Sequence, residues 1–367
     1  MTSTGAQRQR VAVVGLGIGA AHADAFARLP DAFEVVAVAD PDQERVDFVR
    51  SFVDADGATS LDDVLARDDV DIVSLATPPF LHFDQIRTAL HSGRHVVCEK
   101  PVVGSLADVD ALRALERDTE RWVMPIFQYR YGRGLQKLVH LVESGIAGRC
   151  HTVAIDVSWR RRDDYYAVPW RGAWATELGG LLTSHCVHAI DMATLVAGHP
   201  TQVFARTSTR INPIETEDCA SVSLALPDGG FATLSATLGS AAEITRHRFV
   251  FERMSAESNT AAYENHRDPW TFVGDDADAQ AEIDAALDAF VDRSEKYKGQ
   301  FARLADALAV GAPPPVTLAD ARASLEILTA AYRSAATGRD VALPIGTDAP
   351  DYRGWQGSAD RPGPAEQ

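Results

Sequence analysis

The sequence predicts an α/β protein with two domains. Short apolar runs rich in β-branched residues alternate with helical stretches up to residue 127, the pattern of a doubly wound parallel sheet covered by helices. Beyond that point the strands are longer and alternate apolar with polar residues, which predicts an α+β domain whose mainly antiparallel sheet keeps one face free for a partner. We therefore place one domain at residues 1–127, a second at 128–355, and a disordered tail at 356–367.

Composition argues against several classes of protein. The 367 residues are 46% hydrophobic and 24% charged, enough for two cores, and the formal net charge of -17 argues against binding to nucleic acid. The four cysteines share no close spacing, so we expect neither disulfides nor a zinc framework, and a cytoplasmic location. No apolar run approaches the roughly 18 residues of a membrane span, and the N-terminus lacks the apolar core of a signal peptide, so no membrane partner is expected.

The first elements indicate a nucleotide site. A buried strand over residues 11–14 is followed at once by Gly15-Leu16-Gly17-Ile18-Gly19-Ala20 and an alanine-rich helix over residues 20–29. This is the G-x-G-x-x-A form of the dinucleotide fingerprint. Gly15 allows a tight turn, Gly17 lets the backbone approach a pyrophosphate, and the small Ala20 lets the helix pack on the strand. The free N–H groups of the helix N-terminus would then face the phosphates.

The next strand, over residues 34–39, ends in Asp40. A carboxylate there accepts hydrogen bonds from both ribose hydroxyls and repels a 2′-phosphate. Pro41 follows, and the first cationic residue after it is Arg45, so the sequence suggests that no nearby side chain could pair with such a phosphate. We expect NAD in preference to NADP by at least tenfold, about 1.4 kcal/mol.

Two later strands also end in polar residues. The strand over residues 70–76 ends in Thr77-Pro78-Pro79, and a helix over residues 82–92 follows. The strand that begins at His95 runs into Glu99-Lys100-Pro101 and stops at the proline. Ligands of open α/β sheets bind just outside the carboxyl ends of the strands. Lys100 is therefore either a proton donor or hydroxyl-polarising group beside a ligand, or a solvated surface lysine.

The remaining expected elements complete both domains. Ser60 has the character of a helix N-cap, and Pro227-Asp228-Gly229-Gly230 predicts a hairpin. Helices are expected over residues 106–119, 135–144, 183–197, 281–310 and 318–337, and strands over 122–127, 150–160, 202–211, 219–226, 231–239 and 246–252.

Polar groups gather on one face of the helix that follows Gly179-Gly180. The two glycines would let backbone approach a ligand at the start of that face, which carries Ser184, His185, His188 and Asp191. The face is either a substrate site or tied up in internal hydrogen bonds, and Asp191 either orients His188 or is a structural partner. The preceding stretch, residues 160–171, is either a solvated charge run or a lid and sugar-stacking wall formed by Tyr166, Trp170 and Arg171.

Several separated motifs, in the right order, resemble the Gfo/Idh/MocA family of oxidoreductases over roughly residues 10–355. The motifs are Gly15-x-Gly17-x-x-Ala20-x-His22, Ala76-Thr77-Pro78-Pro79-x-x-His82, Glu99-Lys100-Pro101, Gln128-Tyr129-Arg130-Tyr131, Trp170-Arg171, and Gly179-Gly180 leading to His188-x-x-Asp191.

The resemblance implies a Rossmann domain joined to a C-terminal domain with a large, open sheet, and homodimers or homotetramers formed through that sheet. It implies reversible hydride transfer between nicotinamide and a secondary hydroxyl of a sugar, cyclic polyol or derivative, with Lys100 and His188 at the reacting carbinol. At the cofactor we then expect Gly15, Gly17, Ile18, Gly19, Asp40, Thr77, Pro78, His82, Glu99, Lys100, Trp170 and Arg171. At the substrate we expect Lys100, Tyr129, Arg130, Tyr166, Ser184, His185, His188 and Asp191.

One departure concerns the acid that many relatives carry four residues before the histidine. That position is Ser184 here, so proton transfer falls to Lys100 and His188. Histidine has a pKa near neutrality in its ordinary state, and we expect His188 to titrate between about pH 6 and 8.

Two other functions stay open. One is an enzyme that recycles tightly bound NAD internally, including a redox-neutral glycoside-modifying enzyme; the other is a catalytically silent NAD-binding regulator, against which Lys100 and His188 argue. The spacing His185-x-x-His188-x-x-Asp191 could suit a metal, but no cysteine lies at ligand spacing and we expect no metal.

Overall fold

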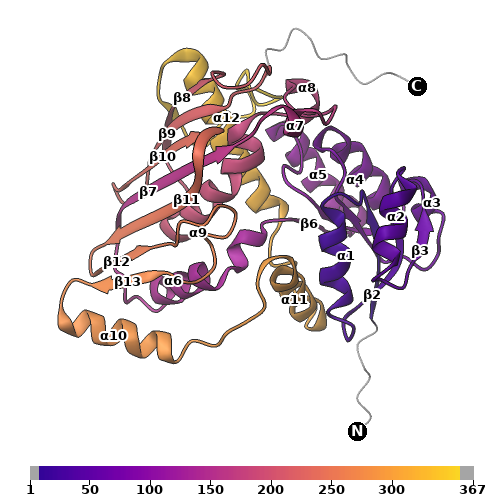
Figure 1. Ribbon diagram of the computed structural model, residues 1–367, viewed down its shortest axis with the longest axis horizontal. Helices are drawn as coiled ribbons and strands as arrows, with labels where there is room; N and C mark the ends of the chain where they lie inside the picture. Colours follow the sequence, from indigo (N-terminus) through magenta and orange to yellow (C-terminus); the bar gives the residue numbers. More distant parts are fainter. Residues whose placement is uncertain (1–7, 356–367) are drawn as a thin grey trace.

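Two sheets lie side by side in the computed structural model, which describes residues 8–355 (Figure 1). The first has six parallel strands in the order β3-β2-β1-β4-β5-β6, and the second has eight strands in the order β13-β12-β11-β7-β10-β9-β8-β14. The predicted fold class is confirmed. The tail expected at residues 356–367 lies outside the described residues.

The first sheet is built from short apolar strands with helices between them. All four residues of β4 are buried, as parallel strands covered on both faces require. Ser60 accepts a hydrogen bond from the backbone N–H of Asp63 and caps α3, as predicted. The strands are β1 (Gln9–Val14), β2 (Phe33–Ala39), β3 (Asp56–Ala58), β4 (Ile72–Leu75), β5 (His95–Cys98) and β6 (Val123–Pro125). The helices are α1 (Gly19–Ala27), α2 (Gln43–Arg50), α3 (Leu61–Leu65), η1 (Pro79–Leu81), α4 (His82–His91) and α5 (Leu106–Thr119).

The second sheet has two unlike faces. Along β10, Ala232, Leu234 and Ala236 are buried whereas Phe231, Thr233 and Ser235 are exposed, so one face packs on helices and the other is open. The neighbouring strands pair antiparallel apart from β7 and β10, which run parallel, and the predicted hairpin joins β9 to β10. The strands are β7 (Cys150–Arg160), β8 (Gln202–Ser208), β9 (Cys219–Ala225), β10 (Phe231–Thr237), β11 (Gly239–Phe251), β12 (Met254–Glu257), β13 (Thr271–Gly274) and β14 (Val341–Ala342).

The helical elements of this half are η2 (Gln128–Tyr131), α6 (Arg133–Glu143), α7 (Asp163–Tyr166), α8 (Trp174–Glu177), η3 (Leu182–Cys186), α9 (Val187–Ala197), α10 (Ala277–Asp288), α11 (Lys296–Ala309) and α12 (Leu318–Thr337). The predicted helix over residues 183–197 begins as the π-helical turn η3 before it continues as α9.

The single helix expected over residues 281–310 is wrong. It is two helices, because α10 packs on β13 and α6 whereas α11 packs on η2 and on α1 of the first domain. One straight helix could not reach both sets of partners, and Lys296, at φ 55°, begins α11 after the break.

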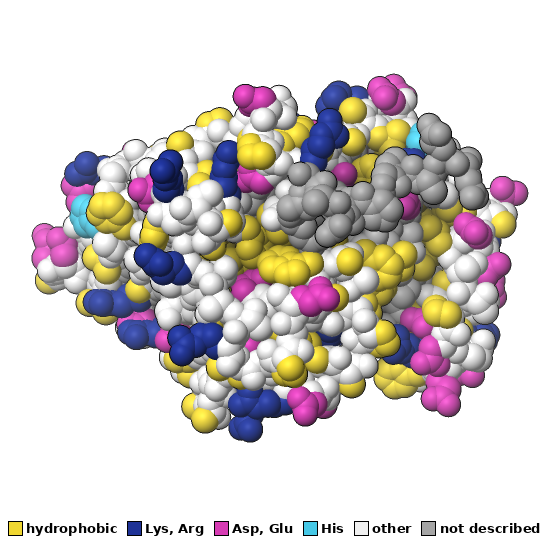
Figure 2. Space-filling view, turned by 90° about the horizontal axis from the view of Figure 1, so that it is seen from above, with side chains coloured by type: hydrophobic (Ala, Val, Ile, Leu, Met, Phe, Trp, Pro, Cys, Tyr) yellow, Lys and Arg dark blue, Asp and Glu magenta, His cyan; other side chains and the backbone are white. Residues whose placement is uncertain are grey.

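One helical stretch, Trp174–Ala197, is long and apolar enough to cross a membrane by length and composition alone, contrary to the expectation that no run approaches that length. Because 72% of its most apolar window is buried inside the molecule, it has the character of a core helix. Seen from above, apolar side chains gather along the middle of the molecule, where the two domains meet, and charged side chains are more frequent toward both ends (Figure 2).

Candidate active site

The glycine-rich turn after β1 has the shape that a dinucleotide requires. A Cβ on Gly15 would lie 2.7 Å from the backbone oxygen of Ala76, and its φ is +86°. A Cβ on Gly17 would meet nothing nearer than 4.0 Å, so the backbone there is open to a ligand, whereas a Cβ on Gly19 would lie only 3.1 Å from the Val13 side chain. The close helix–strand contact that the sequence assigned to Ala20 is thus made by Gly19. Ile18, half-exposed, precedes a helix whose N-terminus has no side-chain cap.

Asp40 fixes the ribose end of this cradle. It is 4% exposed, and its two oxygens accept hydrogen bonds from the backbone N–H groups of Leu16 (2.7 Å) and Asp42 (2.9 Å). Each oxygen keeps a lone pair for a ribose hydroxyl. The expectation that no cation lies close to Asp40 is wrong, because α2 brings the guanidinium of Arg45 to 3.6 Å from its carboxylate.

Asp40→Ser should therefore shift the cofactor preference on its own. The variant removes the charge that repels a 2′-phosphate and releases Arg45 to pair with one, so the ratio of kcat/KM for NADP to that for NAD should rise about 10- to 100-fold, or roughly 1.4–2.8 kcal/mol. Adding Arg45→Ala should cancel most of the gain. An unchanged ratio in Asp40→Ser would contradict the role given to Asp40.

His82 ties together the two loops that follow β4 and β5. Its ring nitrogens lie 2.8 Å from the backbone oxygen of Pro101 and 2.9 Å from that of Thr77. The side chain is fully buried, and burial lowers its pKa. His82 thus holds the loop of Thr77 and Pro78 against the segment that carries Lys100. This supports an indirect role for His82 at the cofactor.

Glu99 faces away from Lys100 into a buried network. Its Oε1 accepts hydrogen bonds from the Tyr297 hydroxyl at 2.9 Å and lies 3.1 Å from Nε2 of His22, while Oε2 accepts the backbone N–H of Lys100 at 3.1 Å. Burial by itself raises the pKa of Glu99, but His22 and Lys100 outweigh it and lower the pKa to about 2. These contacts favour an anchoring role over direct contact with the cofactor.

Lys100 reaches from the end of β5 across to the second domain. Its Nζ donates a hydrogen bond to the backbone oxygen of Ser184 at 2.7 Å. Burial lowers the pKa of Lys100, Arg171 adds to the effect, and Glu99 opposes it. Ser184 lies in the π-helical turn η3, and such turns occur frequently at functional sites. A lysine with a lowered pKa, held between two domains, is suited to proton transfer.

His188 lies beside Lys100 in a stack of three rings. Tyr129 of η2 stacks on His188 at 4.4 Å between centroids and on His266 at 4.2 Å. His188 is 5% exposed, and its Nδ1 is buried with no partner in residues 8–355, as is that of His185. Each ring is therefore free to bind a ligand hydroxyl.

The structure does not support the expectation that His188 titrates between about pH 6 and 8. Burial and the charge of Lys100 lower its pKa well below the ordinary value of 6.5, although Glu99 opposes them. His188 is therefore neutral near pH 7 and suited to hold a hydroxyl in place, while the proton passes to Lys100.

Arg130 and Asp191 bond to each other. The Nε and Nη2 atoms of Arg130 donate to the two carboxylate oxygens of Asp191 at 2.8 and 2.7 Å, and Nη1 donates to Asp320 of α12 at 2.8 Å. Asp191 is 2% exposed. Burial raises the pKa of its carboxyl, although the charge of Arg130 opposes this effect. This arrangement favours a brace between η2, α9 and α12 over contact with substrate.

The glycine pair before η3 serves internal packing. A Cβ on Gly180 would lie 2.1 Å from the backbone oxygen of Glu217. The Glu217 carboxylate accepts the backbone N–H groups of Gly180 (3.1 Å) and Leu182 (2.9 Å) and the Tyr332 hydroxyl (2.8 Å), and burial raises the pKa of Glu217 to about 7. The sequence predicted that these glycines face a ligand. In the structure they instead pack inside the domain, where the buried Glu217 supports η3.

The aromatic and basic stretch, residues 160–171, is followed by α8, which contacts η1 of the first domain. The guanidinium of Arg171 lies 3.9 Å from the ring centroid of Tyr165 and 4.3 Å from that of Trp170. This stack holds Trp170 and Arg171 together, and Arg171 lies near enough to Lys100 to lower its pKa. Contact of the two residues with the cofactor stays a prediction. Tyr166 packs at its edge, 5.1 Å from Tyr165 between centroids.

Glu177, which sequence reasoning missed, brings a carboxylate into the same site. It is 2% exposed, accepts the backbone N–H of Gly172 at 2.6 Å and lies 3.4 Å from Nη1 of Arg171. Burial raises the pKa of the Glu177 carboxyl, although the Gly172 N–H group, Arg171 and the nearby Ser184 side chain oppose this. The sequence shows a serine, not an acid, at position 184, but no local pattern indicates that Glu177 lies next to Ser184.

The described residues include no group of three or more His, Cys, Asp or Glu side chains placed to hold a metal. They do provide an open glycine turn, an uncapped helix N-terminus, a carboxylate beside that turn, and a half-buried lysine close to a histidine with an unpartnered nitrogen. A dinucleotide with its reactive ring beside Lys100 fits these features. The arrangement can bind a hydroxyl and remove its proton.

Comparison with known proteins agrees with this geometry. Residues 9–127 match the profile described as "Oxidoreductase family, NAD-binding Rossmann fold", and residues 135–257 match "GFO/IDH/MocA C-terminal domain". An uncharacterised oxidoreductase of Synechocystis sp. is 28% identical over 236 residues, 59% of this chain and 62% of that protein, so the match spans less than two thirds of its length.

Two further matches extend over most of the chain. D-xylose 1-dehydrogenase (NADP(+)) 2 of Haloferax volcanii is 27% identical over 84% of this chain and 92% of its own. The WlbA dehydrogenase of Bordetella pertussis, solved with NADH and UDP-GlcNAcA, is 26% identical, with a TM-score of 0.79 over 93% of this chain and 100% of that one.

Proposed function

Since this chain belongs to the Gfo/Idh/MocA family of NAD-binding oxidoreductases that act on CH–OH groups, we propose that it transfers a hydride reversibly between nicotinamide and a secondary hydroxyl of a sugar or sugar derivative. The observation that carries the proposal is the position of Lys100, at the carboxyl end of β5, 2.7 Å from the backbone of the π-helical turn and beside the unpartnered ring of His188. The name of the D-xylose dehydrogenase and the UDP-GlcNAcA bound to the WlbA dehydrogenase support this substrate class.

The residues divide the work of alcohol oxidation. Bound NAD supplies the acceptor for the hydride that leaves carbon. Neutral Lys100 accepts the hydroxyl proton, and the carbonyl product keeps the electron pair of the O–H bond. His188 and His185 each offer a ring nitrogen to hydroxyls of the sugar, and Tyr129 keeps His188 in place by stacking. In the reverse direction protonated Lys100 returns the proton.

A panel of sugars, sugar acids and cyclic polyols with NAD, followed by NADH absorbance, tests the proposal. We expect activity with at least one class and a rate of oxidation that rises with pH, because deprotonation of Lys100 produces the base and its lowered pKa brings that step below 10.5. His188→Asn should lower kcat/KM but leave the shape of this pH profile unchanged.

Other outcomes of the panel would redirect the proposal. Loss of the rising limb in His188→Asn would return the titrating role to His188. Nicotinamide absorbance that stays with the purified protein, together with turnover that releases no NADH, would favour internal recycling of the cofactor. Tight NAD binding with no turnover on any class would favour a regulator.

We further propose that the protein is a cytoplasmic homodimer or homotetramer that forms through the open face of the second sheet. Small side chains such as Ser221 and Ser223 line that face beside Phe231, which is 58% exposed. A flat surface of this kind suits a second copy of the same sheet. Sedimentation equilibrium would test it, and a monomer at micromolar concentration would contradict it. All four cysteines are unpaired, which fits the reducing cytoplasm.

A further inference from the structure

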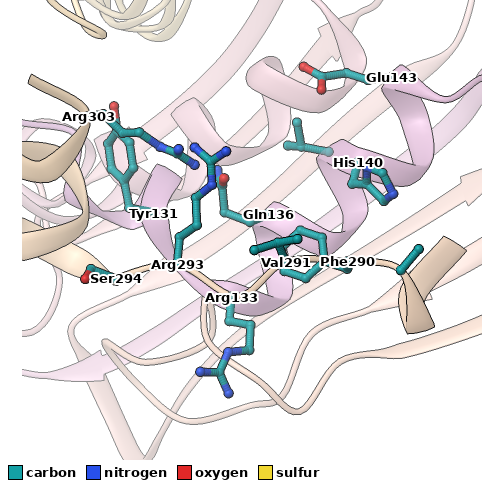
Figure 3. Close-up of a pocket in the computed structure, with 12 residues that line it drawn as sticks. Tyr131, Arg133, Gln136, His140, Glu143, Phe290, Val291, Arg293, Ser294 and Arg303 are labelled. Atoms are coloured by element: carbon teal, nitrogen blue, oxygen red, sulfur yellow. The ribbon is translucent and has the colours of Figure 1, made fainter. Parts of the chain in front are cut away.

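A pocket of about 330 Å³ lies between α6, α11 and the segment of residues 289–295 that joins α10 to α11 (Figure 3). Neither Lys100 nor any residue of the glycine turn lines it, so it is separate from the candidate active site. Its walls are formed by Tyr131, Arg133, Gln136, Val139, His140, Glu143, Ala289, Phe290, Val291, Arg293, Ser294 and Arg303.

Two arginines in this pocket converge. Figure 3 shows the guanidinium groups of Arg293 and Arg303 turned toward each other and toward the amide of Gln136. Neither guanidinium forms an ion pair with an acid in residues 8–355. The third arginine, Arg133, points away from them and lies 3.0 Å from the carboxylate of Asp292. The pocket therefore holds two like charges that form no ion pair in residues 8–355, and Glu143, an acid of α6, also lines it.

This arrangement carries an electrostatic cost that a bound anion would remove. Two like charges repel each other, and they do so more strongly in a partly enclosed site than in open water. The chain as a whole has a net charge of -17, so two neighbouring cations that form no ion pair in the described residues stand out against its general character. Guanidinium groups are planar forks that match the oxygens of phosphate and carboxylate, and the Gln136 amide adds a donor.

The remaining walls favour an organic ligand over a bare ion. Phe290 packs against His140 of α6, with 5.7 Å between ring centroids, and closes one end of the pocket. Val291 is 71% exposed, a high value for an apolar side chain, and lies beside it. A volume of about 330 Å³ is that of a site for a small metabolite.

We propose that this pocket binds a small metabolite that carries a phosphate monoester or carboxylate group. The oxyanion lies between Arg293, Arg303 and Gln136, and the apolar part of the ligand covers Val291 and Phe290. Such a ligand connects α6, residues 289–295 and α11, and should raise the unfolding temperature because it binds only the folded protein.

The test uses the full chain with NADH at saturation, so that the glycine turn is already occupied. Isothermal titration calorimetry compares inorganic phosphate, phenyl phosphate and succinate. We expect phenyl phosphate to bind about tenfold more tightly than inorganic phosphate because its ring covers the apolar wall, and all three affinities to fall with added salt. Phenyl phosphate against succinate distinguishes a phosphate from a carboxylate ligand.

Arg293→Gln with Arg303→Gln should abolish binding of all three probes, whereas Arg87→Gln, a matched change of an exposed arginine on α4, should leave it intact. If Arg303→Gln impairs folding, Arg293→Glu alone gives the same test, because Arg293 is exposed and its substitution leaves the core untouched. No binding at millimolar concentration, or equal binding in the double variant, would overturn the proposal. Val291→Ser should weaken phenyl phosphate alone.

Discussion

Lys100→Ala should lower kcat by two to four decades and leave NAD binding nearly intact. Removal of a general acid–base group lowers the rate of the chemical step by a factor of this size. The Nζ of Lys100 donates to the Ser184 backbone oxygen, and alanine offers no group that could replace it there. The cradle for the nucleotide, Gly15 to Gly19 and Asp40, is untouched by the change. Steady-state kinetics with the best substrate of the panel, and calorimetry with NADH, measure the two effects separately.

Lys298→Ala on α11 is a suitable control, since it removes a lysine that belongs to no part of the candidate site. It should retain the kinetics of the parent protein. Turnover of Lys100→Ala within a factor of three of the parent would refute the assignment. The rise of oxidation rate with pH should also disappear in Lys100→Ala, because the group that titrates is gone.

Arg130→Ala should destabilise the protein by about 3–5 kcal/mol, the cost of leaving a buried acid without its partner. Arg130 has a 13% exposed side chain and donates all three of its bonds to Asp191 and Asp320. Urea unfolding measures the loss. Arg113→Ala, which removes a partly exposed ion pair with Asp110, should cost about 1 kcal/mol or less in the free energy of unfolding.

The same variant separates a brace from a substrate contact. If Arg130 only holds η2, α9 and α12 together, its loss should disturb the neighbouring Tyr129 and with it the Tyr129–His188 stack. The folded fraction of Arg130→Ala should then have a lower kcat but nearly the same KM. A variant as stable as the parent protein with a KM raised tenfold would restore Arg130 to the substrate site.

Local pattern was sufficient for much of the fold. Residues 106–119, 150–160 and 318–337 were predicted with the observed ends, because capping residues and a clear period mark them. The helix over residues 281–310 was wrong because its break is imposed by two separate docking surfaces, which no period in the sequence reveals. The strands β12, β13 and β14 were missed because they are too short to show a clear alternating pattern, and β14 pairs with β8, far along the chain.

The site divides in the same way. Gly15, Asp40 and Lys100 could be found because each follows an apolar strand, and the carboxyl ends of parallel strands meet at one edge. The sequence could not indicate the roles of three residues that the packing of distant segments brings to the site: Arg45, Glu177 and Glu217. The pairing of Arg130 with Asp191 spans 61 positions and leaves no local trace.

The docking of α11 also limits how this protein can be divided or recombined. Phe301 stacks on Phe26 of α1 with ring centroids 3.8 Å apart, and the Gln300 side chain bonds to the backbone of Phe127 and Pro125 at the open edge of β6. A gene fragment ending at residue 127 would thus encode a nucleotide-binding half with an uncovered aromatic surface and an unfinished sheet edge. In chimeras with related enzymes, α11 has to be inherited with the first half of the chain, although 173 positions separate Gln300 from Phe127.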